Sequence, residues 1–268
     1  MAATRLSLSP DGRSIAFVAG NRLAIRAFDV LEPRVVSDVE GMGTPFWSPD
    51  GQQIAVASGG KLRIHNLSGG MPRTIAEINT NLPGAWGADG TILIGVVGDG
   101  IFRIPATGGA LIRVTKVDPA RAEARHMLPQ FLPDGRHFLY LAASSNAAAN
   151  MLFAGSLDSG QLTPIAQLES AATFVPLRPG KSEGYLLFAR GNSVMAQAFD
   201  AASLHISGQP MEVASRVAVN PALGASLEIA HFSGAGDSLA FFGTTPGAMN
   251  GGRRSITVVQ DWMTGLPR

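Results

Sequence analysis

The stretch Ser9-Pro10-Asp11-Gly12 returns along the chain, and its spacing decides the fold. Clear copies are Ser48-Pro49-Asp50-Gly51, Gly87-Ala88-Asp89-Gly90 and Leu132-Pro133-Asp134-Gly135, and the successive glycines lie 39, 39 and 45 residues apart. Weaker copies lie around Pro179-Gly180 and at Gly234-Ala235-Gly236-Asp237. A self-similar unit of about 40 residues is typical of a β-propeller blade. The sequence therefore predicts six repeats.

Each Pro-Asp-Gly is interpreted as a turn between two strands. Proline presets φ for the first turn position, aspartate can accept a hydrogen bond from its own backbone, and glycine accepts the left-handed conformation. Apolar runs such as Ile54-Ala55-Val56-Ala57 follow the turns. Next come alternating segments such as Lys61-Leu62-Arg63-Ile64-His65 and short fourth segments such as Arg73-Thr74-Ile75-Ala76. This order predicts four strands in a typical unit.

We predict an all-β fold, a six-bladed β-propeller of four-stranded blades that forms a single domain over residues 1–268. The units cover approximately 4–43, 44–82, 83–127, 128–170, 171–224 and 225–268. The sixth unit has only three recognisable strands and ends with Ile256-Thr257-Val258-Val259. We therefore expect an incomplete last blade, whose outer strand either comes from residues upstream of Met1 or is missing.

Composition argues against several classes of partner. Lys plus Arg number 21 and Asp plus Glu number 20, without a run of like charges, so we expect no nucleic-acid partner. There is no cysteine, and the five histidines lack short ligand spacing, so we expect no metal site and no cofactor. The apolar run Ile92 to Val97 is far shorter than the roughly 20 residues of a spanning helix. We expect no membrane insertion by this chain.

Three segments resemble repeats of TolB-like β-propellers, which are similar to WD repeats. They are Phe46-Trp47-Ser48-Pro49-Asp50-Gly51, Pro129-Gln130-Phe131-Leu132-Pro133-Asp134-Gly135-Arg136-His137-Phe138-Leu139-Tyr140 and Gly184-Tyr185-Leu186-Leu187-Phe188-Ala189-Arg190. The order of segments is also similar to the propeller region that follows the catalytic domain in bacterial membrane-linked serine/threonine protein kinases. The end of the chain, Ser255 to Trp262, looks like the C-terminus of such proteins.

This resemblance implies a noncatalytic sensor or scaffold that binds a protein, a peptide or a small ligand within a signalling receptor. It also implies an extracytoplasmic, periplasmic location if the likeness to the kinase receptors holds. The alternative is a gating propeller associated with a prolyl-oligopeptidase-type hydrolase, which also contains TolB-like repeats. That alternative requires an α/β-hydrolase domain downstream, whereas the sequence stops at Arg268.

The sequence lacks the motifs of an enzyme. We find no Gly-rich loop, strand lysine, His-Arg-Asp loop or Asp-Phe-Gly site of a kinase. Gly180-Lys181-Ser182-Glu183-Gly184 matches the nucleophile-elbow pattern, but a strand follows the serine where the elbow needs a helix. It is therefore interpreted as a polar hairpin loop. We predict no catalytic residue.

The candidate ligand-binding residues are Arg121, Glu123, Arg125 and His126, in a charged crossover from Asp118 to His126 between units three and four. Arginine forks bind carboxylates, phosphates or peptide ends, and such a loop would crowd the mouth of the central channel. The competing interpretation is a network of salt bridges between blades. A third is acid–base chemistry by His126 and Glu123, for which no nucleophile is evident.

The aromatic residues Trp47, Trp86 and Phe131 occupy equivalent places on the first strands. They could line a ligand channel. Equivalent spacing is also what the packing of repeats produces, and we favour packing.

Overall fold

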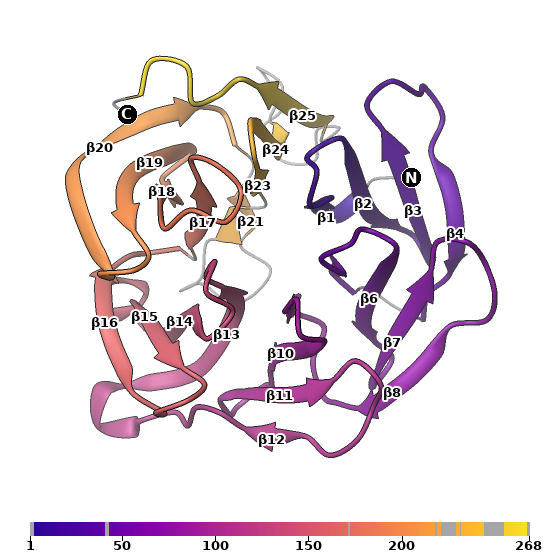
Figure 1. Cartoon of the computed structure of the whole chain (residues 1–268), viewed down its shortest axis with the longest axis horizontal. Coiled ribbons are helices and arrows are strands. Elements are labelled where there is room, and N and C mark those ends of the chain that lie inside the picture. Colours follow the sequence, from indigo (N-terminus) through magenta and orange to yellow (C-terminus); the bar gives the residue numbers. More distant parts are fainter. Residues whose placement is uncertain are drawn as a thin grey trace.

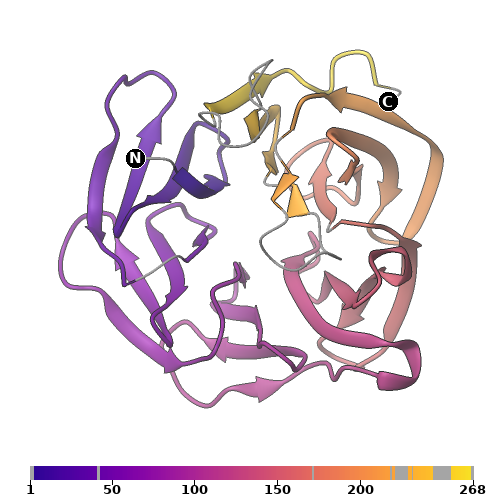
Figure 2. The ribbon, with the colours of Figure 1, turned by 180° about the vertical axis from the view of Figure 1, so that it is seen from behind.

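The computed structural model describes residues 3–40, 43–170, 172–217, 219–220, 229–230, 232–243 and 255–266. Six antiparallel sheets stand in a ring around a common axis (Figure 1), and the view from behind shows the same ring (Figure 2). The helical elements of the described residues are two short 3₁₀ turns, η1 (Pro119–Arg121) and η2 (Ala147–Ala149). The molecule is a six-bladed β-propeller, as predicted.

Each of the first five blades is a four-stranded meander in which successive strands pair. The strands of blades 1 to 3 are β1 (Ala3–Leu8), β2 (Ser14–Ala19), β3 (Arg22–Ala27) and β4 (Arg34–Asp38); β5 (Pro45–Trp47), β6 (Gln53–Ser58), β7 (Lys61–Asn66) and β8 (Arg73–Glu77); and β9 (Ala85–Trp86), β10 (Thr91–Gly95), β11 (Ile101–Pro105) and β12 (Ile112–Arg113). Those of blades 4 and 5 are β13 (Glu123–Phe131), β14 (His137–Ser144), β15 (Met151–Ser156) and β16 (Leu162–Gln167); and β17 (Ala172–Pro176), β18 (Glu183–Arg190), β19 (Ser193–Asp200) and β20 (His205–Ala214).

The sixth blade has three described strands, in agreement with the prediction of an incomplete blade. They are β23 (Phe232–Ala235), β24 (Ser238–Gly243) and β25 (Ser255–Gln260). A separate two-stranded sheet, β21 (Val219–Asn220) with β22 (Ile229–Ala230), precedes them. Strand β1 pairs with β2 in blade 1. Among the described residues, then, no sheet joins the two ends of the chain.

The repeated turns have the geometry that their sequence predicts. In the first, the Gly12 amide donates to the Ser9 carbonyl over 2.9 Å, and the Arg13 amide donates to Asp11 Oδ1 over 3.0 Å. Gly12 has a φ of 69°, a left-handed conformation that favours glycine. The turns at Gly51, Gly90 and Gly135 repeat the backbone bond. These hairpins join first to second strands, at the end of the blades where third strands also turn into fourth strands.

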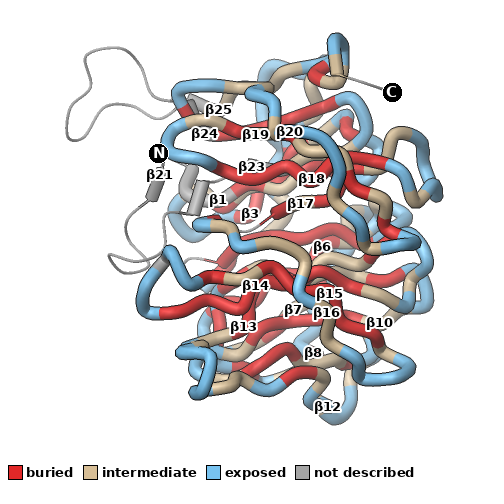
Figure 3. The backbone as a smooth tube through the Cα atoms, turned by 90° about the vertical axis from the view of Figure 1, so that its left-hand side faces the viewer, coloured by how far each residue is buried: buried red, intermediate tan, exposed pale blue. Residues whose placement is uncertain are grey.

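The core lies between the blades, and alternate residues of one strand serve two neighbouring blades. In β6, Ile54 and Val56 pack with blade 1 while Ala55 and Ala57 pack with blade 3. Because side chains alternate across a sheet, a strand buried on both faces must be apolar throughout. This explains the continuous apolar runs of the second strands. Figure 3 shows these strands as buried and the turns as exposed.

The ring closes by side-chain packing between blades 1 and 6. Leu6, Leu8 and Ile15 of blade 1 form a buried cluster with Ala240 of β24. Gly12 also approaches blade 6 closely, since a Cβ atom placed on it would lie 2.8 Å from the Ala235 carbonyl oxygen. Closure in the described residues therefore rests on the same face-to-face packing that joins the other blades.

The crossover into blade 4 is shorter than the sequence suggested. Strand β13 begins at Glu123, five residues before the expected start of the fourth unit at 128. Glu123, Arg125 and His126 therefore lie on the inner strand itself. No helix among the described residues is long and apolar enough to span a membrane.

Candidate functional site

The structure places the four candidate residues at the junction of blades 3 and 4. Arg121 ends η1, and Glu123, Arg125 and His126 follow on β13. Asp118 begins η1, where its side chain accepts a hydrogen bond from the Ala120 amide over 2.9 Å. Ala122, with a φ of 55°, then turns the chain into the strand. This sharp turn brings Arg121, Glu123 and His126 together.

Glu123 is a nearly buried carboxylate that three donors surround. It accepts hydrogen bonds from the Asp118 amide (2.6 Å), Arg121 Nε (2.8 Å) and His126 Nε2 (2.9 Å). Burial alone would raise the pKa of Glu123, but the hydrogen bonds from Arg121, His126 and Asp118 together hold that pKa below its ordinary value. Glu123 is therefore ionised at neutral pH.

His126 connects this carboxylate to blade 3. Its Nδ1 lies 2.7 Å from Thr115 Oγ1, which accepts a bond from the Ile101 amide over 2.8 Å. Burial lowers the pKa of His126, although the contact with Glu123 acts in the opposite direction. A neutral imidazole must then donate a hydrogen bond from Nε2–H to Glu123 and accept one at Nδ1 from the Thr115 hydroxyl. The result is a chain of hydrogen bonds from the backbone of β11 to Glu123.

Aromatic rings cover the inner side of this network. The Tyr140 ring lies 4.7 Å from that of His126 and stacks on Phe153 at 5.6 Å. The Arg121 guanidinium lies 5.5 Å from the Phe153 centroid. Burial raises the pKa of the Tyr140 hydroxyl, which has no hydrogen-bond partner among the described residues. This hydroxyl sits in an apolar layer between the two blades.

The side chains of this network bond mainly to one another, and most of them are buried. The His126 side chain is 0% exposed and that of Glu123 is 5% exposed, whereas that of Arg121 is 49% exposed. Arg121 also forms an ion pair with Asp118 at 3.0 Å. Arg125 is half-buried and has a partner of its own. The ion pairs of this network lie within the crossover and β13, and the hydrogen bond from His126 to Thr115 connects them to blade 3. Both the interpretation as salt bridges between blades and ligand binding by these residues stay predictions, and Arg121 offers the accessible group.

The equivalent aromatic residues pack between blades. Trp47 lies in the cluster between blades 1 and 2, and its Nε1 donates to the Ser7 carbonyl over 3.1 Å. Trp86 packs in the cluster of blades 2 and 3, and Phe131 in that of blades 3 and 4. The preference for packing over a channel lining is borne out by these contacts.

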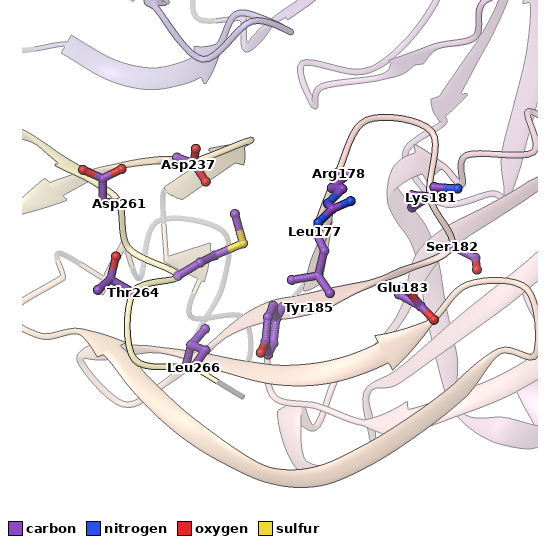
Figure 4. Close-up of a pocket in the computed structure, with 11 residues that line it drawn as sticks. Leu177, Arg178, Lys181, Ser182, Glu183, Tyr185, Asp237, Asp261, Thr264 and Leu266 are labelled. Carbon is purple, nitrogen blue, oxygen red and sulfur yellow. The ribbon is translucent and has the colours of Figure 1, made fainter. Parts of the chain in front are cut away.

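A pocket that the sequence did not reveal opens between blades 5 and 6 (Figure 4). Its volume is about 780 Å³. It is lined by the hairpin that joins β17 to β18, by the turn before β24 and by the segment after β25, through Leu177, Arg178, Lys181, Ser182, Glu183, Tyr185, Asp237, Asp261, Met263, Thr264 and Leu266. The hairpin lies more than 50 residues before the other two segments, so no local motif could predict the pocket. The hairpin around Lys181 and Ser182 leads into β18, which contradicts a nucleophile elbow.

The described residues contain no group of three His, Cys, Asp or Glu side chains placed to hold a metal ion.

Fold and sites together define the chain as a β-propeller with polar clusters between its blades. Comparison with known proteins adds further observations. No protein-family model matches the sequence, and no curated protein matches it significantly.

Solved structures do resemble the chain. It is similar to TolB from Acinetobacter baumannii, with a TM-score of 0.59 and 15% identity, covering 78% of this chain and 55% of TolB. It is also similar to an oligogalacturonate lyase in complex with manganese, with a TM-score of 0.56 and 14% identity, covering 95% of this chain and 76% of the lyase. A chain of a mitotic checkpoint complex has a TM-score of 0.61 and 12% identity, and the match covers 91% of this chain and 70% of that chain. At these identities the likeness establishes the fold, that of TolB-like propellers.

Proposed function

We propose that this chain is a noncatalytic binding or scaffold propeller that docks a protein or peptide partner on the turns of blades 1 and 2. One observation carries the proposal. Leu31 is 85% exposed and Met71 is 95% exposed, and they occupy the corresponding turns of adjacent blades, between β3 and β4 and between β7 and β8. Contiguous exposed apolar patches mark protein interfaces, and we infer that these two side chains belong to one such patch.

The surroundings of these turns support docking. A groove of about 750 Å³ runs between blades 1 and 2, and both Val30 and the indole of Trp47 line it. Asp11, Asp50 and Arg34 add polar groups to its lining. An apolar centre with a polar rim is the usual anatomy of a protein interface. The likeness to a chain of the mitotic checkpoint complex is consistent with a propeller that works by assembly.

The absence of catalysis is part of the proposal. Its support is that the Glu123–His126 pair, the acid–base combination that the sequence suggested, is buried and hydrogen-bonded within the fold. A general base must reach the proton that it removes, either directly or through one water. The likeness to a lyase does not argue for a reaction here, because the same fold supports many functions.

The finer proposal is that the propeller belongs to a bacterial membrane-linked serine/threonine kinase receptor and faces the periplasm. Its support is the resemblance of the repeats and of the segment from Ser255 to Trp262. Reading the gene upstream of the Met1 codon tests it. A membrane helix and a kinase domain in the same reading frame are the expected result, and a stop codon in frame directly before Met1 would contradict it.

The docking proposal is tested by photo-crosslinking in the native host. A photoreactive amino acid replaces Leu31 in one variant and Ile112, an exposed apolar residue of blade 3, in a matched control. We expect a discrete partner to crosslink at position 31 and not at 112. The identified partner is then purified and titrated against the propeller by calorimetry.

Substitution completes this test. The double variant Leu31→Asp, Met71→Asp should weaken binding of the purified partner by about tenfold or more, the effect of removing central apolar contacts. Ile112→Asp should leave the affinity unchanged. Crosslinking of equal strength at both positions, or an affinity that the double variant does not alter, would refute docking on blades 1 and 2.

A further inference from the structure

The pocket between blades 5 and 6 is built by the segment that follows the last strand. Asp261, with a φ of 53°, turns the chain out of β25, and two turns follow up to Leu266. Trp262 anchors the segment: its Nε1 donates to the Gly236 carbonyl over 3.1 Å, and its ring meets that of Tyr185 edge-on at 6.1 Å. The segment is therefore fixed to both blades and forms one wall of the pocket.

Charges of opposite sign face the pocket from opposite sides. In Figure 4, Asp237 and Asp261 stand on the side of blade 6, and Arg178 and Lys181 stand on the hairpin of blade 5. Within the described ranges, none of these four side chains makes an ion pair. Four ionic groups are therefore available to a bound molecule.

The floor between the two walls is apolar. Tyr185 is buried there, with Leu177, Met263 and Leu266 partly buried around it. A volume of about 780 Å³ lies within the range of small-molecule sites and exceeds what a single amino acid would fill. The pocket thus combines an apolar floor with an anionic wall and a cationic wall.

We propose that this pocket binds a zwitterion of the size of a short peptide with both termini free. Its carboxylate would lie at Arg178 and Lys181, its ammonium group at Asp237 and Asp261, and its apolar body on the floor. This small-ligand site is separate from the docking surface on blades 1 and 2. It would make the propeller a receptor for a soluble molecule in addition to a scaffold.

A molecule with both charges fits better than an ion of one sign. The lining contains two cations and three carboxylates. The third carboxylate, Glu183, stands below Ser182 on the side of the cationic hairpin (Figure 4). A simple anion would meet repulsion from the carboxylates, and a simple cation would leave Arg178 and Lys181 without counter-charge. A zwitterion aligned across the pocket satisfies both walls.

The experiment uses the tripeptide Ala-Leu-Ala with free termini as the probe. Three matched peptides carry an N-acetyl group, a C-terminal amide, or both. Each is titrated into protein labelled with ¹³C on the methionine methyl groups, in which Met263 reports on the floor and is assigned by the variant Met263→Leu. We expect the free peptide to shift the Met263 signal saturably, and each blocked terminus to weaken binding by about two- to fivefold, as the loss of one exposed ion pair does.

Variants of each wall assign the two ends. Asp237→Asn with Asp261→Asn should weaken the free peptide and abolish the penalty for acetylation, while leaving the penalty for amidation. Arg178→Ala with Lys181→Ala should do the reverse. Asp29→Asn, an exposed carboxylate outside the pocket, is the matched control and should change neither penalty. All of these charges are exposed, so each variant is expected to fold, which circular dichroism checks.

Two results would overturn the proposal. One is equal binding of all four peptides, which would indicate apolar contact alone. The other is the lack of a Met263 shift at about 10 mM free peptide in a folded protein. Neither result bears on the protein partner of blades 1 and 2, since Leu31 and Met71 lie outside this pocket.

Discussion

At the scale of single residues, two buried groups have protonation states set by their surroundings: hydrogen bonds keep Glu123 ionised, and burial keeps His65 neutral. Glu123 is ionised because three donors replace its water. His65 is neutral: it is 3% exposed and its Nδ1 lies 2.6 Å from Ser37 Oγ of the neighbouring blade. His65 joins adjacent blades directly and Glu123 does so through His126 and Thr115, so their protonation should affect stability more than local structure.

The first prediction concerns Glu123→Gln. It should lower the free energy of unfolding at pH 7 by about 2–4 kcal/mol, because Arg121 and His126 lose a buried ionic partner. Asp158→Asn, which breaks an exposed pair with Arg136, should cost less than about 1 kcal/mol. Urea denaturation of the variants measures both. The folded pKa of Glu123 is depressed, so its contribution exists above pH 4.5 and disappears as the pH falls through the folded pKa.

The second prediction concerns His65. Burial, with a smaller effect from Arg63, lowers the pKa of its imidazole to about 4. Since the unfolded state binds the proton more readily, stability should be full above pH 6.5 and fall steadily to about pH 4, by up to about 3 kcal/mol. His65→Gln keeps a hydrogen-bonding side chain for Ser37 and removes the titration. Denaturant midpoints measured from pH 7 to pH 4 should decline less in this variant. An unchanged slope would count against a neutral buried imidazole.

At the scale of elements, the inner strands of blades 4 and 5 are held together by one amide side chain. Gln130 of β13 donates through Nε2 to the Phe174 carbonyl over 2.8 Å and accepts from the Phe174 amide through Oε1 over 2.7 Å. The Gln130 amide thus makes the pair of hydrogen bonds that a neighbouring strand's backbone would make with Phe174, although the two sheets are not paired with each other. A bulge between Met127 and Gln130, with Leu128 at a φ of 56°, accompanies this position.

The third prediction is that Gln130→Ala lowers stability by about 2–3 kcal/mol, since both backbone groups of Phe174 lose a partner. Gln197→Ala, which removes an exposed bond to the Gly208 carbonyl, is the control and should cost less than about 1 kcal/mol. Thermal or chemical unfolding compares the two variants. Equal losses would show that the Gln130 bonds are replaced by water.

At the scale of the whole molecule, the blade interfaces differ in how much they bury. The described cluster between blades 6 and 1 has four buried residues, Leu6, Leu8, Ile15 and Ala240. The clusters between blades 2 and 3 and between blades 4 and 5 have ten each. Buried apolar area is the main favourable term in such contacts, and among the described side chains the closure between blades 6 and 1 buries fewer residues than these two interfaces. We therefore expect the ring to open first where it closes.

The fourth prediction follows from this difference. Amide hydrogen exchange under native conditions should show faster opening for β1 and β24 than for β6, β10 and β14, because local opening begins where the fewest apolar contacts break. Ala240→Asp should accelerate exchange in both blades 1 and 6 and leave the β10 amides slow. Uniform exchange around the ring would contradict a weak closure.

The sequence predicted those features that repeat. The turn signals and apolar runs recur in each unit, so blade number, strand order and the three-stranded sixth blade followed from them. The network around Glu123 was predicted as residues but not as geometry, since Thr115 lies in the segment after β12 and Tyr140 lies on β14. The pocket of blades 5 and 6 escaped prediction because Lys181, Asp237 and Asp261 meet only in three dimensions.

The closure of the ring by packing has a consequence for how such a chain can evolve. Where a blade is assembled from both ends of a chain, inserting a repeat elsewhere keeps that shared sheet but changes the ring around it. Here, in the described residues, every sheet is encoded by one contiguous stretch. Gene duplication of one stretch would therefore add a finished blade, and only the curvature of the ring would have to adjust.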